Sequence, residues 1–142
     1  MKNMIYAGLS SSTSVAVNGV IPISTVAKRY VKPNSRNSIS LVGNAVAITT
    51  KCGSSPRYNV DVSVTFTGAT AGDADFTLYQ DGVAVAFASG TETVGTASTE
   101  YHTITFPASI TVGCCSTDAL TIVNTGDIGV TVYNASIRVV ED

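Results

Sequence analysis

The sequence has no tryptophan, a single histidine and few charged residues, and these shortages narrow the range of possible functions. A hydrolase with a Ser-His-Asp triad would have to use His102, because the chain offers no other imidazole. Nucleophile elbows, glycine-rich phosphate loops and zinc-protease motifs do not occur in it either. We therefore expect a protein that is not an enzyme and that carries no cofactor or catalytic metal.

Cysteines are also few. A small secreted domain held by disulfides usually has an even number of them, whereas this chain has three: Cys52, Cys114 and Cys115. We expect them to be reduced packing residues, since free cysteine packs as a small hydrophobe. A regulatory or intersubunit disulfide is the alternative. A zinc site that combines them with His102 lacks the paired ligand spacing of structural zinc.

Long hydrophobic runs are absent as well. The longest is Val83 to Ala88, far shorter than the roughly 20 residues that cross a bilayer. The first nine residues contain one lysine and only a short apolar stretch, so they do not resemble a secretion signal. We expect a protein that is made in the bacterial cytoplasm and has no membrane partner.

Strand patterns dominate what is present, because Val, Ile and Thr are frequent and suit a pleated surface. Apolar residues alternate with polar ones from Tyr58 to Phe66, which predicts a strand with one buried face. Asp81-Gly82 separates two such runs and predicts a hairpin. The stretch from Val130 to Val140 changes phase, which a bulge near Asn134 would explain.

Turn residues divide the remaining runs into further strands. We expect a short hairpin about Gly43-Asn44, a turn from Gly90 to Gly95, and a strand from Tyr101 that ends at Pro107. About eight strands at this spacing predict one all-β domain, an antiparallel sandwich or jelly roll. This domain should cover residues 37–142.

Residues 1–36 do not share this pattern. Short β-prone pieces are separated there by Ser10-Ser11-Ser12, Asn18-Gly19 and Pro22. Such a segment cannot bury its apolar residues alone, so we expect an extended N-terminal arm that lies along another molecule.

Charge supports this division. Residues 1–57 contain seven basic side chains and no acidic one, while residues 58–142 contain all ten carboxylates and one basic residue, Arg138. The basic side chains cluster in the predicted arm, where few aromatics accompany them, so an acidic protein surface is favoured over nucleic acid as the partner. We predict that the docking residues are Lys28, Arg29, Tyr30, Lys32 and Arg36.

A few side chains suggest more specific roles. His102 shares a strand face with Phe106, so we expect both, with Tyr58, in the core or in a subunit contact. Asp73 and Asp75 could ligate calcium, although turn formation is the commoner role of such residues.

Three stretches resemble the jelly-roll modules of the tumour-necrosis-factor and complement-globular-head superfamily. They are YNVDVSVTF at 58–66, FTLYQDGVAVAFA at 76–88 and LTIVNTGDIGVTVYNASIRVV at 120–140. The opening MKNMIYAGLSSSTSVAVNGVIPISTVAKRY and the Gly113-Cys114-Cys115 cluster are similar to short proteins of phages and prophages of gut Firmicutes. The chain departs from trimeric relatives in having fewer aromatics and no collagen-like stalk.

The resemblance implies a TNF-like homotrimer on a virion, as a head decoration or a fibre component. We predict a capsid decoration protein on the virion surface that docks through its arm onto the major capsid protein or another virion protein. The alternative is a fibre tip that recognises a host surface polysaccharide through exposed aromatics such as Tyr79 and Tyr101.

Overall fold

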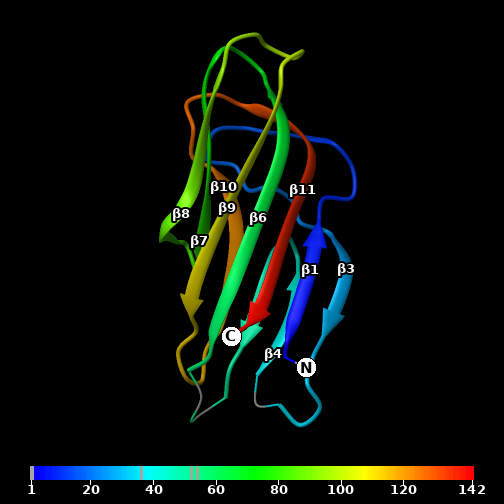
Figure 1. Ribbon diagram of the computed structural model, residues 1–142, viewed down its shortest axis with the longest axis vertical. Helices are drawn as coiled ribbons and strands as arrows, with labels where there is room; N and C mark the ends of the chain where they lie inside the picture. Colours follow the sequence, from blue (N-terminus) through cyan, green and yellow to red (C-terminus); the bar gives the residue numbers. More distant parts are fainter. Residues whose placement is uncertain (1, 36, 52, 54) are drawn as a thin grey trace.

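The computed structural model describes residues 2–35, 37–51, 53 and 55–142, and these residues form two antiparallel β-sheets without a helix (Figure 1). No described element is a helix long and apolar enough to cross a membrane. The prediction of an all-β antiparallel sandwich is confirmed.

Sheet A has the strand order β3-β1-β11-β6-β9, and a short strand, β2, also pairs with β11. Its strands are β1 (Met4–Gly8), β2 (Thr13–Val15), β3 (Thr25–Tyr30), β6 (Arg57–Gly68), β9 (Tyr101–Thr111) and β11 (Val130–Glu141). Sheet B has the order β4-β5-β10-β7-β8. Its strands are β4 (Ser38–Val42), β5 (Ala45–Thr49), β7 (Gly72–Gln80), β8 (Val83–Val94) and β10 (Thr117–Asn124).

The core fills the space between the two sheets. In β6 the alternating residues predicted from the sequence point into this core, from Tyr58 at one end to Phe66 at the other. Phe66 meets Phe76 of β7 edge to face, with ring centroids 5.2 Å apart. Aromatic pairs of this geometry stabilise a core beyond the area that they bury, and this one joins the two sheets.

The two predicted hairpins and the predicted bulge are present. Asp81 and Gly82 connect β7 to β8 with φ angles of 54° and 79°, the left-handed conformation that an Asp-Gly hairpin turn requires. The hairpin about Gly43-Asn44 joins β4 to β5. The register of β11 against β6 shifts between Val132 and Asn134, which confirms the bulge.

Two expected strand ends are wrong. β8 continues through Gly90 to Val94, because this glycine serves close packing: a Cβ there would lie 2.4 Å from Ile104 of β9. β9 continues through Pro107 to Thr111. A proline is tolerated there because β9 is an edge strand and needs no hydrogen bond on its free side.

The predicted extended arm is also wrong. β1 lies inside sheet A between β3 and β11, so most of residues 4–30 belongs to the same fold as the rest of the chain (Figure 1). Ile5, Ile21 and Ile23 are buried in the common core. Polar and apolar residues alternate in this segment only over short stretches, so the sequence alone does not reveal its strands. In the structure the segment nevertheless pairs with β11 and β10 and buries its apolar side chains.

A buried asparagine fixes this N-terminal region to the rest of the fold. The Asn124 side-chain amide donates hydrogen bonds to the carbonyl oxygens of Val15, Ala16 and Ile128, at 3.4, 3.3 and 3.0 Å. Its Oδ1 accepts from the backbone N–H of Gly126 at 3.1 Å. One buried side chain therefore holds the end of β2 against the turn between β10 and β11.

Candidate docking surface

Strand β3 forms one edge of sheet A and carries three of the predicted docking residues. Lys28 and Tyr30 pair with Tyr6 and Met4 of β1, whose side chains lie on the outer face of the sheet. Arg29 lies on the other side, and its Nε donates a hydrogen bond of 2.7 Å to the carbonyl oxygen of Ile39 in β4. Lys28 and Tyr30 thus share a face, while Arg29 connects the two sheets.

The loop after β3 carries the other predicted docking residues. The Lys32 side chain is exposed, and its backbone N–H donates to Oδ1 of the buried Asn3 at 2.6 Å. The Asn3 amide donates in turn to Ser35 Oγ and to the carbonyl oxygen of Asn37. Arg36 lies outside the described residues. The structure therefore brings Lys28, Tyr30 and Lys32 to one edge and holds the loop in place.

The outer face of sheet A is hollowed by a row of small residues. Gly8, Ser136, Ser63 and Thr105 are register partners across β1, β11, β6 and β9. The next row holds larger side chains, Tyr6, Arg138, Asp61 and Pro107. The difference in size between the rows leaves a trough of about 790 Å³ with Met4, Tyr6, Lys28 and Pro107 in its lining. We call this hollow the sheet A trough.

Sequence reasoning missed this trough, because its small residues come from four separate segments. Each residue alone is an ordinary strand residue with an outward side chain. Only the strand register places Ser136 beside Ser63. Gly8 gives no local signal for it either, because it stands at the end of β1 and is not among the lining residues.

Two tyrosines lie together at the other end of this sheet. Tyr101 is 61% exposed, and its ring centroid lies 5.2 Å from that of Tyr133, which is also exposed. The second predicted aromatic, Tyr79, is half-buried in β7 and belongs to sheet B. The structure therefore separates the two tyrosines proposed for glycan contact and gives Tyr101 a different neighbour.

Tyr58 and Phe106 both lie in the core of the single chain. Burial raises the pKa of Tyr58 to about 12, and the nearby carboxylate of Glu141 adds to this effect. The Tyr58 hydroxyl lies 3.5 Å from Glu141 Oε2. Tyr58 is thus fully buried within one chain, whereas Phe106 also lines the sheet A trough.

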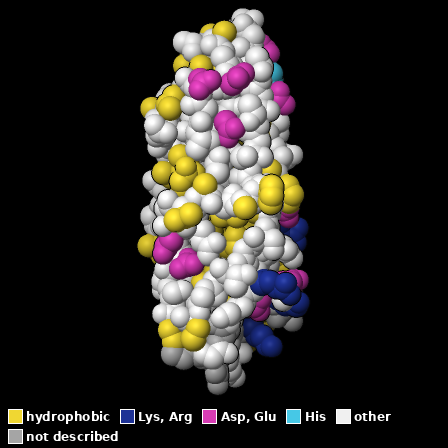
Figure 2. All heavy atoms as spheres, turned by 90° about the vertical axis from the view of Figure 1, so that its left-hand side faces the viewer, with side chains coloured by type: hydrophobic (Ala, Val, Ile, Leu, Met, Phe, Trp, Pro, Cys, Tyr) yellow, Lys and Arg dark blue, Asp and Glu magenta, His cyan; other side chains and the backbone are white. Residues whose placement is uncertain are grey.

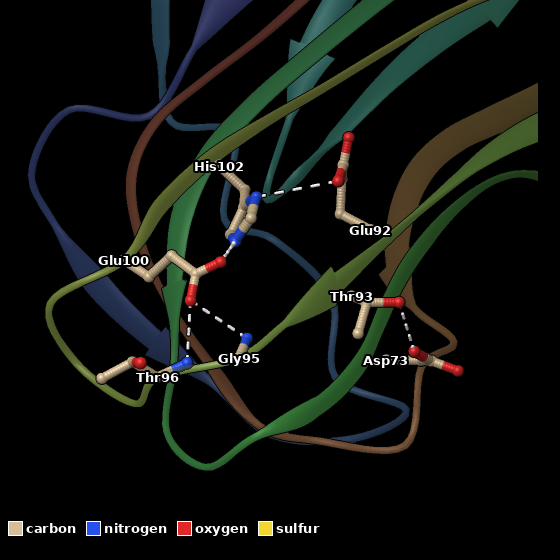
Figure 3. Close-up of polar contacts among 7 residues, drawn as sticks. All are labelled: Asp73, Glu92, Thr93, Gly95, Thr96, Glu100 and His102. Carbon is tan, nitrogen blue, oxygen red and sulfur yellow. Dashed lines mark hydrogen bonds and ion pairs between the residues drawn. The ribbon is translucent and has the colours of Figure 1, made fainter.

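His102 lies between two carboxylates at the start of β9 (Figure 3). Its Nε2 is 2.7 Å from Glu100 and its Nδ1 is 3.7 Å from Glu92. The backbone N–H groups of Thr96 and Gly95 donate to Glu100, and the bond from Thr96 is the main cause that lowers the pKa of this carboxyl. A catalytic triad would place a hydroxyl on one imidazole nitrogen. The cluster instead fixes the turn between β8 and β9.

The two aspartates considered for calcium are engaged by threonines. Asp73 accepts a hydrogen bond from Thr93 at 2.9 Å, as Figure 3 also shows. Asp75 accepts from Thr91 and Thr125 at 2.6 and 2.7 Å. Among the residues that the structure describes, no three His, Cys, Asp or Glu side chains gather as a metal site.

The cysteines differ from the expectation of reduced packing residues. Cys115 takes part in a disulfide, whereas Cys114 is a free and exposed thiol. Cys52 lies outside the described residues. His102 stands at the start of β9 and Cys114 follows its end, so a strand of roughly 3.3 Å per residue separates them. A zinc site that combines these two residues is excluded by this distance.

Comparison with known proteins shows the fold. No family model and no curated protein matches the chain. Solved structures do match it, among them Eiger TNF from S. frugiperda, with a TM-score of 0.62, 16% identity and coverage of 100% of this chain and 94% of that one. The globular domain of zebrafish complement 1qA protein follows, with a TM-score of 0.59, 11% identity and coverage of 94% and 95%.

The vertex protein P5 of phage PRD1 is also similar, with a TM-score of 0.56, 12% identity and coverage of 99% of this chain and 96% of that one. All three comparisons extend over nearly the full length of both chains. The protein therefore has the jelly-roll fold of TNF-like and complement-like domains, and the N-terminal residues are part of that fold.

Proposed function

We propose that this protein is a structural component of a phage virion. It forms a homotrimer that decorates the capsid, binds the major capsid protein or another virion protein, and performs no catalysis. Its location is the capsid surface. The fold similarity to the vertex protein of phage PRD1 and to TNF and complement domains supports this proposal at the level of architecture.

The observation that carries the proposal is the basic edge of sheet A. Strand β3 has an unpaired side, exposes Lys28, and is followed by the exposed Lys32. From residue 58 to residue 137 the chain has no Lys or Arg. A basic edge on an otherwise acidic body favours an acidic partner, and a free strand edge accepts main-chain hydrogen bonds from one.

This edge replaces the arm in the docking mechanism. Because β3 is held by β1, and its following loop by Asn3, docking orders little additional chain and costs less conformational entropy than an arm would. Each subunit of a trimer presents one such edge. Three weak contacts then act together through their effective concentration, and the decorated shell is stabilised.

A binding experiment with purified, undecorated phage shells tests this mechanism. The double variant Lys28→Glu and Lys32→Glu reverses two charges at the edge, so we expect it to lose most of its shell binding. The control Lys51→Glu reverses one exposed charge in the loop after β5 and should bind as the wild type does. Equal binding by the double variant and the wild type would contradict the proposal.

A glycan-binding fibre tip is the second candidate function, and the exposed pair of Tyr101 and Tyr133 favours it. Aromatic faces of this kind stack on apolar faces of sugar rings. The variant Tyr101→Ser should then lose binding to host cell-wall polysaccharide and keep binding to phage shells. If it loses neither, the tyrosine pair has no role in recognition.

A further inference from the structure

Phe87 is the most exposed large apolar side chain among the described residues, with 100% of its surface accessible. It lies in β8, which is an edge strand of sheet B. The residues before it belong to the longest apolar run of the sequence, and Val83 of that run is 69% exposed. Figure 2 shows this side of the molecule, with apolar patches on its middle part. A monomer gains nothing from leaving such a side chain in water.

The outward position of Phe87 requires an unfavourable backbone conformation. Its φ angle is +61°, a left-handed conformation that is unfavourable for a bulky residue. The register of β7 against β8 shifts here, since Thr77 pairs with Ser89 but Tyr79 pairs with Ala84. The extra residues form a bulge, and bulges commonly redirect a side chain at a sheet edge. The bulge and its unfavourable φ both place the phenyl ring outward.

The sheet A trough is a suitable receptor for this ring. It is lined by the side chains of Met4, Tyr6 and Pro107, which offer apolar and aromatic contacts to a phenyl group. Its floor consists of the small partners Ser63 and Ser136. The trough and Phe87 lie on different surfaces, since one is on the outer face of sheet A and the other is on the edge of sheet B.

Charge indicates how two copies would meet. Asp81 and Glu92 flank the exposed part of β8, and no basic residue lies on β7 or β8. Lys28 and Arg138 line the trough together with a single acid, Asp61. Figure 2 agrees, because carboxylates lie above and below the apolar patches while Lys and Arg appear only near one lower margin. Two β8 edges would repel each other, whereas an edge and a trough attract.

We infer that Phe87 of one copy inserts into the sheet A trough of a second copy, and that this contact closes the homotrimer. The contact is head-to-tail, because the two surfaces differ, and head-to-tail contacts form rings when the rotation closes. This inference rests on the proposed self-association and names the surfaces responsible for it. It leaves the loop after β3, with the exposed Lys32, free for the shell, whereas Lys28 of β3 lines the trough.

Size-exclusion chromatography with light scattering, over a range of protein concentrations, tests the contact. The variant Phe87→Asn removes the ring and places there a residue that tolerates positive φ, so the subunit should stay folded. Because truncated aromatic anchors weaken contacts strongly, we expect the dissociation constant to rise about 30-fold or more. The control Val42→Asn changes an exposed apolar residue of β4 and should leave the assembly intact.

A reciprocal variant tests the trough. Ser63→Phe fills its floor and should also yield monomers, with circular dichroism showing that the fold is kept. If this variant misfolds, Arg138→Glu replaces it and should weaken assembly by reversing the charge at the rim. In an equal mixture, the Phe87→Asn subunit keeps an intact trough and the folded trough variant keeps Phe87. One contact can therefore form between them, so heterodimers should appear.

The outcomes separate the two proposals. A wild-type protein that stays monomeric at every concentration overturns the homotrimer and this inference with it. A wild-type trimer that persists in the Phe87→Asn variant overturns only the inference. Mixing that gives no heterodimer, although each variant is folded and monomeric, overturns the assignment of the trough as the receptor.

Discussion

The substitution Ile5→Ala tests whether the N-terminal segment is an integral part of the fold. Ile5 is fully buried and pairs with Val139 across β1 and β11, so its removal leaves a cavity in the common core. Truncation of a buried isoleucine to alanine lowers the free energy of unfolding by about 2 to 5 kcal/mol. For a chain of this length such a loss lowers the melting temperature by roughly 10 °C.

Urea unfolding followed by circular dichroism, at one fixed protein concentration, measures this loss as a lower midpoint with an unchanged slope. The control Val26→Ala truncates an exposed residue of the neighbouring strand β3 and should change the free energy of unfolding by no more than about 0.5 kcal/mol. If Ile5→Ala behaves like this control, β1 contributes nothing to the core and the segment is a detachable arm after all.

Two further predictions concern buried polar groups. The raised pKa of Tyr58, about 12 against 10.0 in an unfolded chain, gives stability that is complete below pH 10 and is lost as the pH rises toward 12. The loss should approach roughly 2 to 3 kcal/mol, and a Tyr58→Phe variant followed by denaturation at pH 9 and pH 12 should not show it. Asn124→Ala leaves three backbone carbonyls without their donor and should cost about 2 kcal/mol or more. In the same urea assay, the exposed Asn59→Ala should be near neutral, and equal midpoints for the two variants would contradict the structural role of Asn124.

The sequence predicted those elements whose conformation depends on residues close together in the chain. Alternation over nine residues identified β6, the Asp81-Gly82 pair identified the hairpin of β7 and β8, and the phase change in β11 identified the bulge near Asn134. Each of these features is determined by residues close together in the chain. The corresponding predictions are confirmed for that reason.

The position of the first strands could not be read in the same way. Ile5 finds its partner Val139 at the far end of the chain, and no local pattern encodes such a pairing. Serine, glycine and proline interrupt the segment, and these residues indicate a loop or an arm when they are read alone. The same physical reason hides the sheet A trough, because it is formed by register across four strands.

The basic docking residues were predicted from their charge, and Tyr30 was added because it lies among them. Lys28, Arg29 and Lys32 are all exposed. Arg29 differs from the two lysines because its Nε is already bonded to the Ile39 carbonyl oxygen. Alternation along β3 explains the difference, since neighbours in a strand point to opposite faces. Phe87 was missed because the bulge that exposes it lies within an ordinary apolar run.

The location of β11 has a consequence for the synthesis of the protein. This strand follows all the other strands of the fold in chain order, yet it separates β1 from β6 and pairs with both. Until it emerges, the nascent chain carries two apolar strands with unpaired edges, and these are the features that make unfinished β-proteins prone to aggregate. Sheet A can therefore be completed only after β11 has left the ribosome, and a chain that stalls before this point lacks the central strand of the sheet.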